Sequence, residues 1–85
     1  MIIEVCGKGC MKCETTEKNV LQALKELGLN PGIDVLVNHI RDIKMISARG
    51  VIMTPSVVIN GVKMSQGRIP EVSEIKKWLE ENKGK

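Results

Sequence analysis

Aromatic residues are almost absent from this chain of 85 residues. It contains one tryptophan, Trp78, and neither phenylalanine nor tyrosine. Proteins that bind single-stranded nucleic acids stack the bases on several aromatic rings, so this class of function is excluded. The net charge is only +3 and the basic residues are scattered, so no phosphate-binding stripe is indicated either. The core must therefore be built from Ile, Val, Leu and Met.

Long apolar runs and a leader segment are missing as well. No stretch approaches the roughly 20 apolar residues that cross a bilayer. The chain opens on the strand-like run Met1–Val5, not on a basic and then apolar signal sequence. Its three cysteines all lie between positions 6 and 13, whereas secreted domains spread an even number along the chain. We therefore expect a cytoplasmic protein whose cysteines are catalytic or metal-binding.

Hydrophobic periodicity predicts seven elements within a single domain, residues 1–85. Strands are expected at 2–5, 33–37, 56–59 and 62–65. Three helices are expected: one at 11–27, a short one that begins after the N-cap Asp42 and is ended by Gly50, and one at 71–82. Asn60-Gly61 between two apolar runs is the strongest short-range signal for a hairpin. The first strand–helix–strand unit requires a parallel pair with a right-handed crossover. The fold class is therefore α/β, in the order β-α-β-α-β-β-α, with a mixed four-stranded sheet between helices.

Cys10 and Cys13 stand where the first helix begins. A two-residue spacer on a helical turn places both thiols on one face, at a separation that a disulfide tolerates. Cys10 lies among the unpaired N–H groups of the helix N-terminus, and Lys8 and Lys12 add positive charge. Both effects lower the pKa of the Cys10 thiol, and the thiolate is the form that attacks a disulfide. Cys10 is therefore predicted to be the nucleophile, and Cys13 the resolving thiol.

A second feature, Thr54-Pro55, immediately precedes the third predicted strand. Proline is tolerated at the first residue of a strand but not within a central one. At this point the chain resembles the thioredoxin/glutaredoxin fold, in which a Thr-Pro or similar dipeptide with a cis peptide bond faces the Cys-x-x-Cys motif. It is most similar to the small glutaredoxin-like "redox-active disulfide" thioredoxins of archaea and bacteria. The matching segments cover nearly the whole chain: residues 9–13, 50–55, 58–61 and 67–68.

The resemblance implies a thiol–disulfide oxidoreductase, a protein disulfide reductase or electron carrier whose only redox group is the Cys10–Cys13 disulfide. It implies that Pro55 is the cis residue that keeps the third strand open for a substrate. The main chain of Thr54 would then bind an extended substrate segment by strand addition. Glu4 lies six residues before Cys10, the offset at which thioredoxins bury an acid that helps to deprotonate the resolving cysteine. The alternative for Glu4 is a solvated strand residue.

Departures from the family pattern bear on the substrate and the reductant. Gly9 replaces the tryptophan of thioredoxins, and Met11-Lys12 replaces Gly-Pro. Residues 66–68, Gln-Gly-Arg, replace the Gly-Gly-Asp-like cluster with which glutaredoxins bind glutathione, so a thioredoxin-reductase-like or other dithiol donor is the expected reductant. We expect a monomer that acts on disulfide-containing proteins. Its predicted substrate contacts are Met11, Lys12, Met53, Thr54, Pro55 and Gly67, with Ile52 in the aliphatic rim.

Metal binding is the alternative function. Cys6, Cys10 and Cys13 form a Cys-x₃-Cys-x₂-Cys motif that looks like the cluster motif of radical S-adenosylmethionine enzymes, but 85 residues cannot build their barrel. A zinc or iron–sulfur site normally needs a fourth ligand, and His39 is the one spare imidazole. Copper carriers have similar thiols but end in a strand, whereas this chain ends in the helix 71–82. Cys6 itself is expected to pack at the end of a strand, or to be a third exchange partner.

Overall fold

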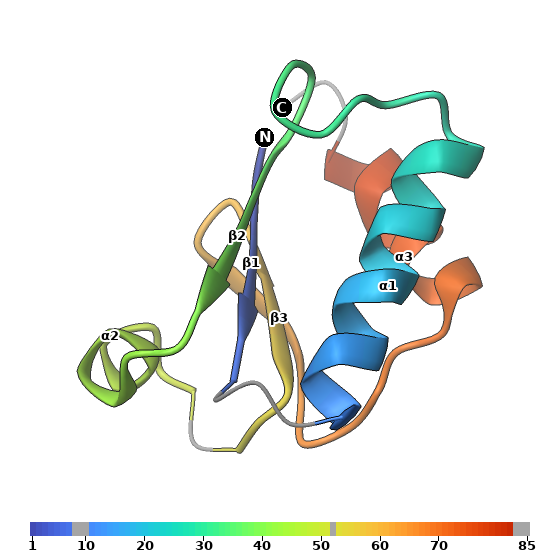
Figure 1. Cartoon of the computed structure of the whole chain (residues 1–85). Helices are drawn as coiled ribbons and strands as arrows, with labels where there is room; N and C mark the ends of the chain where they lie inside the picture. Colours follow the sequence, from blue (N-terminus) through green and yellow to red (C-terminus); the bar gives the residue numbers. More distant parts are fainter. Residues whose placement is uncertain (8–10, 52, 83–85) are drawn as a thin grey trace.

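Strand β1 (Ile2–Cys6) lies in the interior of the sheet, and the rest of the chain is arranged around it (Figure 1). The computed structural model describes residues 1–7, 11–51 and 53–82. The strand order is β2-β1-β3-β4, with β1 parallel to β2 and antiparallel to β3. The other strands are β2 (Leu36–Ile40), β3 (Ser56–Ile59) and β4 (Val62–Gln66). This mixed four-stranded sheet confirms the predicted fold class.

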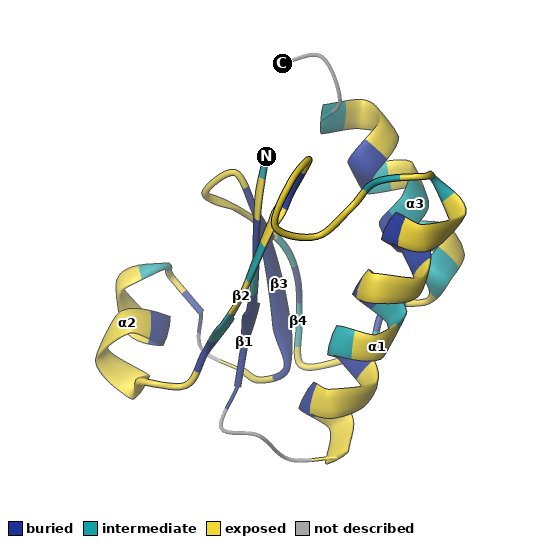
Figure 2. Cartoon of the chain, turned by 45° about the horizontal axis from the view of Figure 1, so that its top comes forward, coloured by how far each residue is buried: buried dark blue, intermediate teal, exposed yellow. Residues whose placement is uncertain are grey.

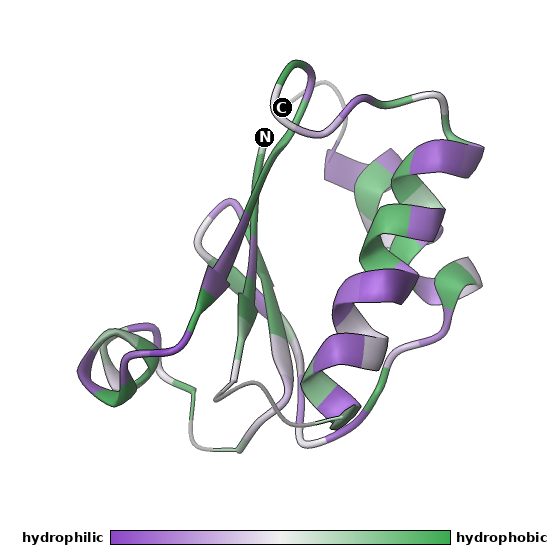
Figure 3. Cartoon of the chain, in the orientation of Figure 1, coloured by the Kyte–Doolittle hydropathy of each residue, from purple (hydrophilic) through white to green (hydrophobic). Residues whose placement is uncertain are grey.

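Helices cover both faces of the sheet. Figure 1 shows α1 (Met11–Glu26) and α3 (Val72–Asn82) together on one face, and the short α2 (Ile43–Ala48) on the other. The buried residues of α1 recur at helical spacing, and Figure 2 shows them turned toward the sheet. In Figure 3 hydrophilic and hydrophobic bands alternate along the same helix. Among the described residues, no helix is long and apolar enough to cross a membrane.

Successive side chains of β1 point to opposite faces, and this alternation divides the core in two. Ile3 and Val5 are fully buried in the larger core, against α1 and α3. Cys6 is fully buried in a second, smaller cluster that includes Ile46 of α2. Glu4 lies on the α2 side with Cys6, where its carboxylate meets Arg49. Ile3 and Val5 therefore face α1 and α3, whereas Glu4 and Cys6 face α2.

The predicted position of the second strand was wrong: β2 spans Leu36–Ile40, not 33–37. Residues 30–34 form a turn, in which the N–H groups of Ile33 and Asp34 donate to the carbonyl of Asn30. The Asp34 carboxylate closes this turn by accepting from the N–H of Asn30 at 2.9 Å. Ile33 is consequently 83% exposed, and pairing with β1 begins where the N–H of Leu36 donates to Met1. The other predicted ends coincide with the observed ones or differ by one residue, except that α2 ends at Ala48, two residues before Gly50. Asp42 is the N-cap of α2 as expected.

Candidate active site

Cys13 lies in the first turn of α1 and is fully buried against the end of β1. The contact depends on Gly7, because a methyl group there would overlap the sulfur of Cys13 and lie 3.2 Å from its Cβ. The same position would lie 3.8 Å from the Cβ of Thr54. Gly7 therefore brings Cys13 and Thr54 together, although 41 residues separate them in the sequence. Cys10, the predicted nucleophile, lies outside the described residues, as does Ile52.

The loop before β3 forms the second wall of this site. The Thr54–Pro55 peptide bond is cis, as the family resemblance implied. The N–H of Gly67 donates to the carbonyl of Pro55 at 2.9 Å. A Cβ on Gly67 would lie 3.0 Å from the terminal methyl carbon of Met53, so the methionine side chain covers this glycine. The structure thus brings the predicted residues Met53, Pro55 and Gly67 together.

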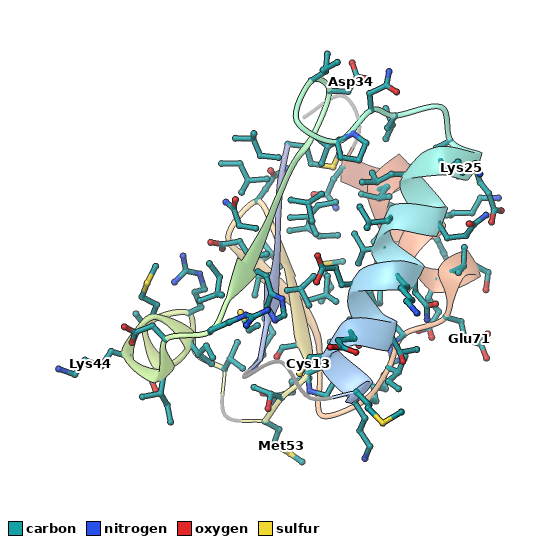
Figure 4. All side chains as sticks on the ribbon, viewed as in Figure 1. Cys13, Lys25, Asp34, Lys44, Met53 and Glu71 are labelled. Atoms are coloured by element: carbon teal, nitrogen blue, oxygen red, sulfur yellow. The ribbon has the colours of Figure 1, made fainter. Side chains whose placement is uncertain are left out.

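An exposed apolar rim lies at this end of the molecule. Figure 4 shows Met53 near Cys13, at the end of the sheet from which α1 starts. Met53 is 57% exposed, and Met11, the first residue of α1, is 82% exposed. Lys12 is exposed as well. The rim residues are therefore available to a partner molecule that approaches the buried sulfur of Cys13.

Glu4 lies on the opposite face of the sheet from these residues. Its carboxylate accepts a hydrogen bond from Arg49 at 2.5 Å, and the side chains are 14% and 24% exposed. This bond to Glu4 raises the pKa of the Arg49 guanidinium above its ordinary value. Arg49 was not predicted from the sequence, since nothing in the local pattern marks a partner 45 residues away. Its position just after α2 is what brings it over β1.

Cys6 is surrounded by apolar side chains, in keeping with the predicted packing role. It belongs to the cluster formed with Ile40, Ile46, Val51 and Val58. Burial raises the pKa of the Cys6 thiol above its ordinary value, and the nearby positive charge of Arg49 opposes this only in part. The thiol is therefore held in its protonated, unreactive form.

Metal ligation finds no support in the part of the chain that the structure describes. There, no group of three or more His, Cys, Asp or Glu side chains is placed to hold a metal ion. His39, the spare imidazole, lies on β2 and its Nδ1 is 3.2 Å from a carboxylate oxygen of Glu17. The other ring nitrogen, Nε2, is buried and has no hydrogen-bond partner among the described groups.

We predict that Gly7→Ala destabilises the protein by about 1–3 kcal/mol, because the added methyl group overpacks the site against Cys13. Urea unfolding measures the change. In Gly7→Ala/Cys13→Ala the overlapping sulfur is gone, so the double variant should lose less stability than the two single variants combined. Strict additivity would show that the contact does not constrain the site.

A second prediction concerns Cys6 and alkaline pH. The pKa of the Cys6 thiol is higher in the folded protein than in the unfolded chain. The contribution of Cys6 to the free energy of unfolding is therefore complete at pH values below its pKa in the unfolded chain, and it is lost as the pH rises through its pKa in the folded protein. Urea unfolding at neutral and alkaline pH should therefore show a smaller alkaline loss in Cys6→Ala than in the parent. Groups common to both proteins cancel in this comparison. Equal losses would contradict the assignment.

Comparison with known proteins agrees with this geometry. Residues 1–80 match the family model described as a thioredoxin domain. A thioredoxin of Methanocaldococcus jannaschii is 39% identical over 79 residues, which cover 93% of this chain and 86% of that protein. A thioredoxin of Methanothermobacter thermautotrophicus is 35% identical over 79 residues, covering 93% and 97%. With a match over nearly its whole length to this family model and to two archaeal thioredoxins, the chain belongs to the thioredoxin family.

Proposed function

We propose that Cys10 and Cys13 are the redox-active pair of this thiol–disulfide oxidoreductase, and that it reduces disulfides in protein substrates. The observation that supports this assignment is the meeting of Cys13 and Thr54 at Gly7, beside the cis bond to Pro55. The second cysteine of the motif is thereby buried under a loop whose exposed Met53 can contact a substrate.

The reaction proceeds by two exchanges. The Cys10 thiolate attacks one sulfur of the target disulfide; this bond breaks, a mixed disulfide forms, and the displaced target thiolate takes up a proton. Cys13, deprotonated, then attacks the Cys10 sulfur and releases the second target sulfur. Two electrons pass to the target, and a Cys10–Cys13 disulfide remains. A partner dithiol restores the reduced pair by the reverse exchanges, so the disulfide itself serves as the redox group without an added cofactor.

The substrate is an extended segment next to the reacting disulfide. Its main chain pairs with the backbone of Thr54, which precedes the cis residue Pro55. Met11 and Met53 supply apolar contacts that adapt to different sequences, because methionine is unbranched and flexible. Lys12 adds a positive charge at the rim, and Gly67 leaves space beneath Met53.

The same site indicates which proteins exchange electrons with this one. Targets are disulfide-containing proteins, and the electron donor is a reductase or another thioredoxin-like dithiol, since residues 66–68 lack the cluster that binds glutathione. The protein acts as a monomer in the cytoplasm, where free thiols are kept reduced and an odd, closely spaced set of cysteines is compatible with folding.

The assignment of the two cysteines predicts that Cys13→Ser accumulates mixed disulfides through Cys10, because the resolving thiol is lost. Non-reducing electrophoresis and mass spectrometry with a disulfide-containing protein substrate detect these species. Cys10→Ser should form none, and Cys6→Ala should behave as the parent. Mixed disulfides in Cys10→Ser, or their absence in Cys13→Ser, would overturn the order of attack.

Glu4 is the proposed proton acceptor for Cys13, since its side chain is only 14% exposed on the central strand β1. Its carboxylate is bonded to Arg49 on the opposite face of the sheet, so this role requires the proton to pass around the end of β1. Glu4→Gln should slow decay of the mixed disulfide at least tenfold, since acid–base groups contribute about 10²–10⁴ to rates, and should leave its formation unchanged. Quenched-flow alkylation separates the two steps. Arg49→Gln is the control, because it breaks the ion pair but keeps the carboxylate. Equal slowing in both variants would assign the effect to the ion pair instead.

A further inference from the structure

A second ionisable pair lies on the same face of the sheet as Cys13. His39, from β2, approaches Glu17, from α1, with 3.2 Å between Nδ1 and Oε2. The side chain of His39 is 14% exposed and that of Glu17 36%. The strand partner of His39 is Val5, which points into the core beneath α1. The pair therefore lies between α1 and the sheet.

Two independent relations place this pair next to Cys13. Glu17 follows Cys13 by four residues in α1, and side chains at this spacing are neighbours on the helix surface. On the sheet, Cys13 rests on Gly7, whereas His39 pairs with Val5, two residues earlier in the same strand. Two residues span about 7 Å along a strand. Both relations put the pair within the range over which charges interact in a partly buried site.

The imidazole has one nitrogen that is not engaged. Nδ1 lies against the Glu17 carboxylate, whereas Nε2 is buried and has no hydrogen-bond partner among the described groups. The imidazole is therefore held by the carboxylate through one ring nitrogen.

On α1 the ionisable residues that share the helix surface with Glu17 are Glu14 and Cys13, three and four residues before it, and from β1 the neighbour is the uncharged Val5. Glu4 of β1 points to the other face, toward Arg49. Arg41 follows His39 by two residues and is exposed.

We propose that Glu17 and His39 are positioning residues whose combined charge sets the fraction of Cys13 present as thiolate. The proposal rests on the resolving role assigned to Cys13 above. The Glu17 carboxylate opposes a second negative charge on Cys13, and the His39 imidazole that it contacts holds the carboxylate in this position. The pair thereby sets the electrostatic potential in which Cys13 loses its proton.

The test of Glu17 uses a protein with Cys6→Ala and Cys10→Ser, in which Cys13 is the one remaining cysteine. Ultraviolet thiolate absorbance against pH then reports Cys13 without interference, because the chain has no tyrosine. Glu17→Gln should lower the midpoint of this titration by about half a pH unit or more. Glu17→Ala provides a second variant with the same expected sign, and Glu80→Gln, an exposed carboxylate on α3, should cause no shift.

The test of His39 uses the otherwise unchanged protein and follows decay of the mixed disulfide. His39→Gln removes the contact that holds the Glu17 carboxylate, so it should change the rate of decay about threefold in the parent and leave the rate unchanged in a Glu17→Gln background. A merely structural role of His39 would change decay equally in both backgrounds. An unshifted midpoint in the Glu17 variants, or an equal effect of His39→Gln in both backgrounds, overturns the proposal. If mixed disulfides form in the Cys13→Ser trapping experiment all the same, the assigned exchange reaction still stands.

Discussion

The close approach of Cys13 to Gly7 is the contact on which the site depends. A side chain at position 7 would push the first turn of α1 away from the end of β1, and with it the sulfur of Cys13, which is proposed to resolve the mixed disulfide. The same missing side chain admits Thr54, so the cis-proline loop closes over Cys13 from the other side. One glycine therefore joins a helix start, a strand end and a loop from the second half of the chain.

The alternation of β1 then assigns each chemical group its surroundings. Ile3 and Val5 bury their side chains under α1 and α3, where each contributes about 1.5–3 kcal/mol. Glu4 and Cys6 point to the α2 face, where a cation meets the carboxylate and apolar residues enclose the thiol. Cys6 and Cys13, seven residues apart, thus have different surroundings: Cys6 is enclosed in an apolar core, whereas Cys13 is buried next to the exposed rim.

Local chemistry made much of this structure predictable. Asn60-Gly61 adopts the positive φ angles, 50° and 82°, that a tight hairpin requires, and the Asp42 side chain accepts from the N–H of Lys44 as an N-cap. The position of β2 was not predictable, because the Asp34 carboxylate holds residues 30–34 in a turn that apolar periodicity does not reveal. The site was predictable where a motif marked it, at Cys13 and Thr54-Pro55. Pairs that only the folded sheet creates, such as Glu4 with Arg49, left no local signal.

The two carboxylate pairs lie on opposite sides of one thin sheet, and this separation has a chemical consequence. In the roles proposed for them, Glu4 exchanges protons with Cys13 and Glu17 opposes its negative charge, and two such carboxylates would interfere if they shared one environment. Glu4 is held by a guanidinium, which stays charged throughout the accessible pH range, so its surroundings are constant. Glu17 is held by an imidazole on the α1 face, one helical turn from Cys13. The fold thereby keeps the two carboxylates proposed to act on this sulfur apart, one on each face of β1.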